Sequence, residues 1–142
     1  MRMEIIFYPA LVLVGHTFLV WCWMYVNRFH AIRKHGIPLR AFKDRRSAAE
    51  TRGATGTASD NFKNLFELPM LFYFATLVVF VTHNVSPWVL WLSWAYVFSR
   101  IIHSLIHITY NKVLHRFFSY ISGSVLLWAL WVVITLRLLG QT

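Results

Sequence analysis

Polar and ionisable side chains recur at helical spacing in stretches of the chain that are otherwise apolar. One stretch carries Asn64 and Glu67 near its start, three residues apart. Another carries Arg100, His103 and His107 at steps of three and four residues. Because side chains at these steps lie on one face of an α-helix, each stretch is predicted to present its polar groups together.

Arg116 and Tyr120 open a third such stretch, one helical turn apart. Arginine keeps its charge when partly buried, so Arg116 is expected to supply a lasting positive charge. Cations outnumber carboxylates among the three polar groups. If they converge, they form a pocket suited to an anionic, water-soluble ligand whose ammonium or amide is held by Glu67.

A purely structural role for these residues is the first alternative. Glu67 would pair with Arg100, or with Lys63 at an i,i+4 step, and Tyr120 would bond a histidine. Pro69 lacks the amide that would bond the Leu65 carbonyl, so the helix is expected to kink close to Glu67.

A metal or haem site is the second alternative. The spacing of His103 and His107 allows both imidazoles to meet one ion, and His16 is the obvious histidine for an opposing haem ligand. The sequence has no HExxH motif and no second HxxxH pair, so we predict no metal site.

The composition indicates an integral membrane protein. Of the 142 residues, 58% are hydrophobic and 18% aromatic, and the mean hydropathy is +0.54. A spanning helix needs about 20 mostly apolar residues, and four segments qualify, at about residues 5–27, 63–82, 87–108 and 117–139. Short connections place consecutive helices antiparallel, so we predict one all-α domain over residues 1–142, an up-down bundle of four transmembrane helices.

The net charge of +9 is concentrated in two places, segment 28–59 and the connection between the third and fourth spans. Basic residues mark the cytoplasmic side of membrane proteins. We therefore predict a cytoplasmic 28–59 loop, whose first part extends the first helix, and outward-facing termini. The charge thus reflects orientation, and no nucleic-acid partner is expected. Compact loops and the absence of a retention signal favour a bacterial inner membrane, with the endoplasmic reticulum as the eukaryotic alternative.

Three motifs together resemble the MAPEG family, the membrane-associated proteins in eicosanoid and glutathione metabolism, over about residues 59–124. The motifs are Asn64-x-x-Glu67, Arg100-x-x-His103, and Arg116 followed by Tyr120. The resemblance implies a homotrimer of four-helix bundles. It also implies that glutathione, as co-substrate, binds between neighbouring subunits near the cytoplasmic side.

The resemblance also implies roles for single residues. Asn64 and Glu67 would hold the glutathione backbone, with Glu67 on the γ-glutamyl amine. Arg100 and His103 would line the same pocket.

The sulfur would be approached by Arg116, with Tyr120 beside it. The first helix of the adjacent subunit would add a basic residue, either Arg28 or Arg33.

Three positions depart from the family pattern. Lys63 stands where members often have an arginine, and Asp60 stands where another arginine is expected. His107 occupies the usual position of a tyrosine. Lys63 and His107 are included in the predicted ligand site.

The implied activity is that of a glutathione-dependent transferase or peroxidase, whose thiolate attacks lipophilic electrophiles or reduces hydroperoxides delivered from the bilayer. The alternative is a non-catalytic protein. It would be a lipid-binding scaffold, like the 5-lipoxygenase-activating protein of the same family, or an accessory subunit of a larger membrane complex.

Overall fold

The structure, a computed structural model, describes residues 2–35 and 59–140 of the chain. Its elements are the 3-10 helix η1 (Met3–Ile6) and the α-helices α1 (Phe7–His35), α4 (Leu68–Val81), α5 (Pro87–Ile108) and α6 (Val113–Leu139). A further helical stretch covers residues 59–64. The helical extension predicted for residues 28–35 is part of α1, whereas most of the predicted 28–59 loop lies outside the described residues.

Four helical segments of the described chain are long and apolar enough to cross a membrane. They are Met3–Lys34, Ser59–Val81, Pro87–Ile108 and Val113–Leu139. This confirms the all-α, four-span prediction, although the fourth helix begins a turn before residue 117. Large apolar side chains such as Trp88 and Val81 are more than 70% exposed, which is the surface expected of helices that face lipid.

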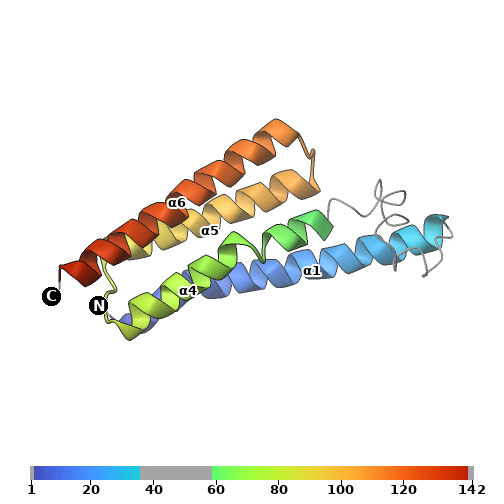
Figure 1. Cartoon of the computed structure of the whole chain (residues 1–142). Coiled ribbons are helices and arrows are strands. Elements are labelled where there is room, and N and C mark those ends of the chain that lie inside the picture. Colours follow the sequence, from blue (N-terminus) through green and yellow to red (C-terminus); the bar gives the residue numbers. More distant parts are fainter. Residues whose placement is uncertain (1, 36–58, 141–142) are drawn as a thin grey trace.

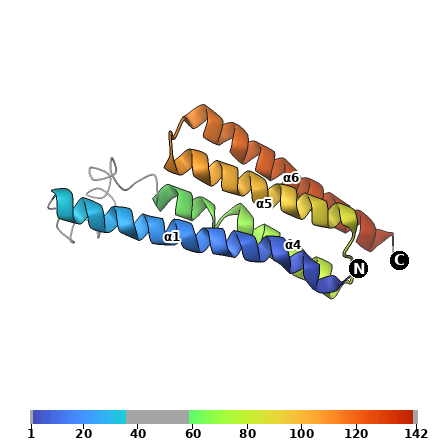
Figure 2. The same ribbon diagram turned by 180° about the vertical axis from the view of Figure 1, so that it is seen from behind.

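The four long helices run side by side (Figures 1 and 2). The two labelled chain ends lie at one end of the bundle, and the α5 to α6 connection lies at the other, beside the helical stretch 59–64. Pro87 begins α5, where it does not remove a needed amide, and the Ser86 hydroxyl accepts from the Val89 amide.

Helices α5 and α6 form the most closely packed pair. Gly123 of α6 allows this approach, because a Cβ atom there would lie 2.8 Å from the Ser99 hydroxyl oxygen of α5. Helices α4 and α5 meet through the rings of Phe72 and Tyr96, whose centroids are 4.8 Å apart. Close packing of α5 and α6 thus holds the polar side chains of these two helices, including His103 and Arg116, next to each other.

The second span is interrupted in the middle of the region that carries the polar groups. Residues 59–64 are helical, Leu65 to Glu67 are not, and α4 starts at Leu68. Glu67 has φ −90° and ψ −97°, outside the helical region. The kink expected from Pro69 is therefore a full interruption of the helix between residues 59–64 and α4.

Candidate functional site

A polar cleft of about 320 Å³ lies among the interrupted segment, α5 and α6. Its lining residues are Asn64, Glu67, His103, Val113, Arg116, Phe117 and Tyr120. All three motifs of the sequence thus contribute to one site, since each supplies at least one of these residues. Arg100, His107, Lys63, Arg28 and Arg33, which were also predicted to belong to the site, do not line it.

Arg116 is half-buried and its guanidinium is held by the turn between α5 and α6. Its Nη1 donates a hydrogen bond to Asn111 Oδ1 at 3.0 Å. Asn111 has φ 48°, a conformation that asparagine tolerates better than most residues. The Nε atom of Arg116 is buried and makes no hydrogen bond within the described residues, whereas the residue itself lines the cleft.

His103 connects α5 to the first turns of α6. Its Nδ1 lies 3.2 Å from the Arg116 carbonyl oxygen and 3.0 Å from the Ser119 hydroxyl. Because a carbonyl oxygen only accepts, Nδ1 carries the hydrogen in this contact. The imidazole also contacts the Tyr120 ring edge-on, with ring centroids 5.8 Å apart. His103 therefore contacts both ends of the helical turn of α6 that runs from Arg116 to Tyr120.

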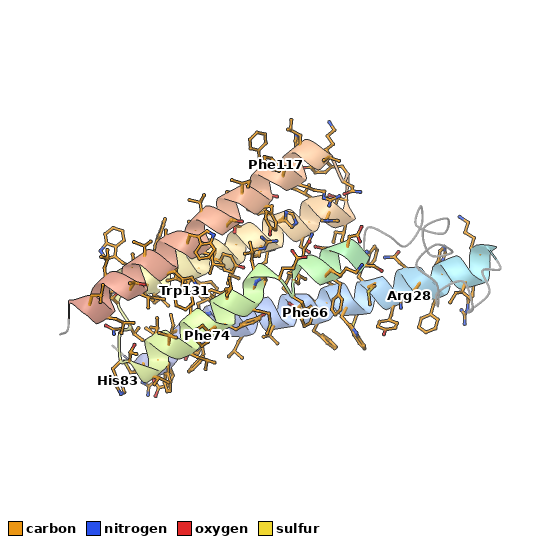
Figure 3. The ribbon with its side chains drawn as sticks, in the orientation of Figure 1. Arg28, Phe66, Phe74, His83, Phe117 and Trp131 are labelled. Carbon is orange, nitrogen blue, oxygen red and sulfur yellow. The ribbon has the colours of Figure 1, made fainter. Side chains whose placement is uncertain are left out.

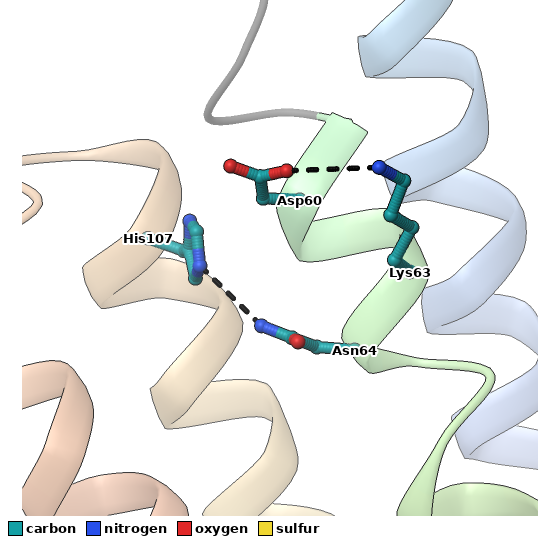
Figure 4. A network of polar contacts seen from close by, with 4 residues as sticks. All are labelled: Asp60, Lys63, Asn64 and His107. Atoms are coloured by element: carbon teal, nitrogen blue, oxygen red, sulfur yellow. Dashed lines mark hydrogen bonds and ion pairs between the residues drawn. The ribbon is translucent and has the colours of Figure 1, made fainter. Parts of the chain in front are cut away.

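Asn64 and Lys63 are neighbours in sequence but face different ways (Figure 4). Asn64 points toward α5, where its Nδ2 lies 3.5 Å from His107 Nε2. Lys63 points away from the cleft, and its ammonium lies 4.0 Å from an Asp60 carboxylate oxygen. Both side chains of that pair are more than half exposed, so the pair contributes little to stability.

Glu67 is exposed and lines the cleft. Within residues 2–35 and 59–140 the contact of Lys63 with Asp60 is the one ion pair within 4.0 Å. The structural alternative required Glu67 to pair with Arg100 or Lys63. Glu67 forms neither ion pair.

Arg100 lies deeper than the sequence predicted, behind the wall of the cleft. It is 0% exposed, and its guanidinium carbon lies 5.2 Å from the centre of the Tyr120 ring. None of its three guanidinium nitrogens has a hydrogen-bond partner among the described residues. Arg100 thus stands behind Tyr120, whose ring separates the buried cation from the cleft.

Arg28 and Arg33 both lie on α1, away from the cleft. The guanidinium of Arg28 stacks on the Tyr25 ring at 5.6 Å, and Arg33 is exposed. Figure 3 shows Arg28 well separated from Phe117, which lines the cleft. A role for either arginine in the site requires a second subunit.

The metal alternative has little support in the described part of the chain. No group of three or more His, Cys, Asp or Glu side chains there is placed to hold an ion. The rings of His103 and His107 are 5.6 Å apart and inclined at 67°, and Nδ1 of His103 is already engaged by α6.

Sequence reasoning missed three polar residues that support the site. Asn61 donates a buried hydrogen bond to the Ser104 hydroxyl at 2.7 Å, and Asn111 accepts from Arg116. Asn61 lies three residues before Asn64, and Ser104 lies three residues before His107. This spacing places each pair on one helix face, and it could have predicted that Asn61 and Ser104 lie near the site.

A second, apolar groove of about 450 Å³ lies between α1 and the interrupted segment. Its lining residues are Val14, Thr17, Phe18, Trp21, Phe62, Leu65, Phe66 and Tyr73. Phe66 is labelled on this side in Figure 3. Segment 62–67 therefore has one polar wall on the cleft and one apolar wall on the groove.

The chain was compared with family models, curated proteins and solved structures. A model described as the MAPEG family matches residues 6–136 of the chain. No curated protein and no solved structure matched the chain.

Proposed function

The chain belongs to the MAPEG family, and from that premise we propose that it is a membrane-embedded glutathione-dependent transferase or peroxidase acting on lipophilic electrophiles. Family membership and the four apolar helices make it an integral membrane protein with a glutathione-related role in general terms. The specific activity is our proposal. The observation that carries it is that Arg116 and Glu67 line the same cleft.

The charges of the cleft complement those of a glutathione thiolate. The Glu67 carboxylate suits the γ-glutamyl ammonium, and Asn64 adds an amide for the peptide backbone. The guanidinium of Arg116 suits a negative sulfur. At about 320 Å³ the cleft is of the size at which small-molecule sites begin.

Arg116 would act by stabilising the thiolate. A free thiol has a pKa of about 8.5, so near neutral pH it is mostly protonated, and a nearby cation raises the ionised fraction. In transfer, the thiol proton passes to solvent, the sulfur forms a bond to the electrophilic carbon, and the leaving group departs with its electron pair. In peroxide reduction, two thiols give a disulfide, and the hydroperoxide gives an alcohol and water. Tyr120, on the same wall as Arg116, would orient the sulfur with its hydroxyl.

The proposed assembly is a homotrimer in which Arg28 or Arg33 of a neighbouring subunit reaches the cleft. Both residues are distant from the cleft of their own chain, which is the reason a neighbour is needed. Native mass spectrometry of the detergent-purified protein tests this, since three chains per particle are expected. A monomer that binds glutathione as tightly as the membrane-embedded protein would contradict it.

The proposed orientation puts the cleft at the cytoplasmic side. Among described cations, Arg33, Lys34 and Lys112 belong to the cleft end of the bundle, and Arg2 and Arg137 belong to the end with the two termini. Labelling of single cysteines introduced at Lys112 and Arg137, in sealed vesicles and in a Cys22→Ala background, distinguishes the two sides. A Lys112 position reactive only from the outside would contradict the orientation.

The test of the activity is glutathione binding to detergent-purified protein, measured by equilibrium dialysis and by thiolate ultraviolet absorbance. We expect Arg116→Ala to remove most of the thiolate signal and Glu67→Ala to weaken binding. Arg137→Ala, at an exposed position of the opposite end, serves as the charge-matched control. Equal binding by the wild type, Arg116→Ala and Glu67→Ala would refute the proposal.

The apolar groove favours a second candidate, a non-catalytic lipid-binding scaffold or an accessory subunit of a larger membrane complex. The groove is uncharged and larger than the cleft, as suits an apolar ligand. This candidate predicts a co-purifying lipid or partner and no thiolate absorbance with added glutathione. A thiolate signal that depends on Arg116 would exclude it.

A further inference from the structure

The helical stretch 59–64, which carries Asn64, is separated from α4 by the non-helical residues 65–67. Its last hydrogen bonds run within itself, from the Leu65 amide to the Asn61 carbonyl at 3.3 Å and from the Phe66 amide to the Lys63 carbonyl at 2.8 Å. Glu67 then leaves the helical conformation. The Met70 amide still donates to the Glu67 carbonyl at 3.2 Å, so Glu67 is tied to α4, whereas the stretch 59–64 lacks the unbroken helical backbone that would fix it to α4.

Two side-chain contacts attach the segment to α5 instead. Asn61 Nδ2 donates to Ser104 Oγ at 2.7 Å, and Asn64 Nδ2 lies 3.5 Å from His107 Nε2. The paired residues are three apart on both helices, so both contacts lie along one seam between facing helix surfaces. The Asn61 contact is the shorter and the more deeply buried of the two.

Asn61 and Ser104 are both 0% exposed. A buried amide or hydroxyl that loses its partner has a large desolvation cost, so separation of the two surfaces is opposed. On the other side of the segment Lys63 and Phe66 are exposed, whereas the half-buried Phe62 packs against the hydrophobic core. The Asn61 to Ser104 bond is thus the buried polar contact that holds this segment to α5, alongside the packing of Leu65 and Phe62 in the core.

We propose that Asn61 and Ser104 are positioning residues of the polar cleft. Their bond sets the distance between the wall with Asn64 and Glu67 and the opposite wall with Arg116. Neither residue lines the cleft, so they act through the residues that do. The consequence for ligand binding rests on the proposed glutathione function, whereas the attachment itself can be tested without any ligand.

The ligand-free test is hydrogen exchange of the detergent-purified protein. We expect Asn61→Leu and Ser104→Ala each to speed exchange in peptides covering residues 59–67, while peptides covering residues 87–100 stay unchanged. Ser93→Ala is the matched control, because Ser93 is equally buried but its hydroxyl bonds only its own helix, at the Val89 carbonyl. Unchanged exchange at 59–67 in both variants would overturn the proposal.

The ligand test is the dissociation constant of glutathione. We expect each single variant, Asn61→Leu or Ser104→Ala, to raise it about threefold to tenfold, the range for loss of one hydrogen bond. The double variant should lose no more than either single variant. The thiolate absorbance at saturating glutathione should stay at the wild-type level, because Arg116 is retained.

The two proposals fail in different ways. If the wild type does not bind glutathione, the proposed function fails, and hydrogen exchange alone decides whether the bond holds the segment. If the wild type binds glutathione but the variants bind it equally well, the positioning role is overturned. Additive losses in the double variant would also overturn it, because the two residues would then act separately.

Discussion

The close packing of α5 and α6 makes the substitution Gly123→Ala a direct test of where Arg100 lies. A Cβ atom at position 123 would be 2.8 Å from Ser99 Oγ and 3.5 Å from both Cδ and Nη1 of Arg100. The shortest distance is too close for undisturbed packing, whereas the two to Arg100 are ordinary van der Waals contacts. The side chain that must move is therefore Ser99. Its hydroxyl donates to the Tyr96 carbonyl at 2.7 Å in the unchanged protein.

The magnitude follows from opposing effects. Alanine is favoured over glycine in a helix by about 1 kcal/mol. A Cβ atom added at Gly15 of α1 would have no other atom within 4 Å, so Gly15→Ala is expected to gain stability of that order. At Gly123 the gain is opposed by loss of the Ser99 bond, about 1 kcal/mol, and by overpacking of about 1–3 kcal/mol. Gly123→Ala should therefore be less stable than Gly15→Ala by roughly 2–4 kcal/mol.

Reversible unfolding in mixed detergent micelles, followed by circular dichroism, measures both variants. Ser99→Ala removes the obstructing atom, so Gly123→Ala in that background should recover most of the difference. Equal stabilisation by Gly15→Ala and Gly123→Ala in the otherwise unchanged protein would refute the packing of α5 on α6. The placement of Arg100 behind Tyr120 would then lose its support.

Three further substitutions test the charges and the turn around the cleft by the same unfolding measurement. Arg100→Met should raise the free energy of unfolding by about 1 kcal/mol or more, because a buried charge without an ion pair is replaced by an apolar chain of similar length. A large decrease in the free energy of unfolding would instead mean that the guanidinium is held by an anion. Asn111→Ala should be about 1 kcal/mol less stable than Asn111→Gly, because both lose the bond to Arg116 but only alanine is strained at positive φ. Lys63→Ala should change stability by less than about 0.5 kcal/mol, and a loss above about 1 kcal/mol would show that Lys63 has a partner beyond Asp60.

The number of helices could be predicted, as could the helix faces that carry the candidate site residues, because both depend on local patterns. Apolar length fixes the spans, and helical spacing puts Asn64 with Glu67 on one face. Pro69 signalled a kink near Glu67, but its extent depends on tertiary packing. Whether α4 continues through a bend or is interrupted is decided by what the preceding segment packs against.

Depth within the bundle could not be predicted from spacing. Arg100 and His103 share a face of α5, yet only His103 lines the cleft, because the Tyr120 ring of α6 covers the guanidinium of Arg100. Lys63 and Asn64 differ by one position, and that step of about 100° around the helix turns Lys63 out of the site. Spacing gives the face of a helix, whereas the neighbouring helix determines which groups on that face remain accessible.

The charged residues Glu67 and Arg116 of the cleft and Arg100 behind its wall differ in burial in a way that favours an anionic occupant. Glu67 is exposed, Arg116 is half-buried and Arg100 is fully buried. The carboxylate therefore keeps most of its hydration, Arg116 loses part of its own, and the fully buried Arg100 loses its hydration at a cost of several kcal/mol. An anion that enters the cleft would meet Arg116 directly and would also interact with Arg100 across the Tyr120 ring. Because low polarity strengthens such attraction, the binding of a thiolate or carboxylate should stabilise the fold as well as fill the site.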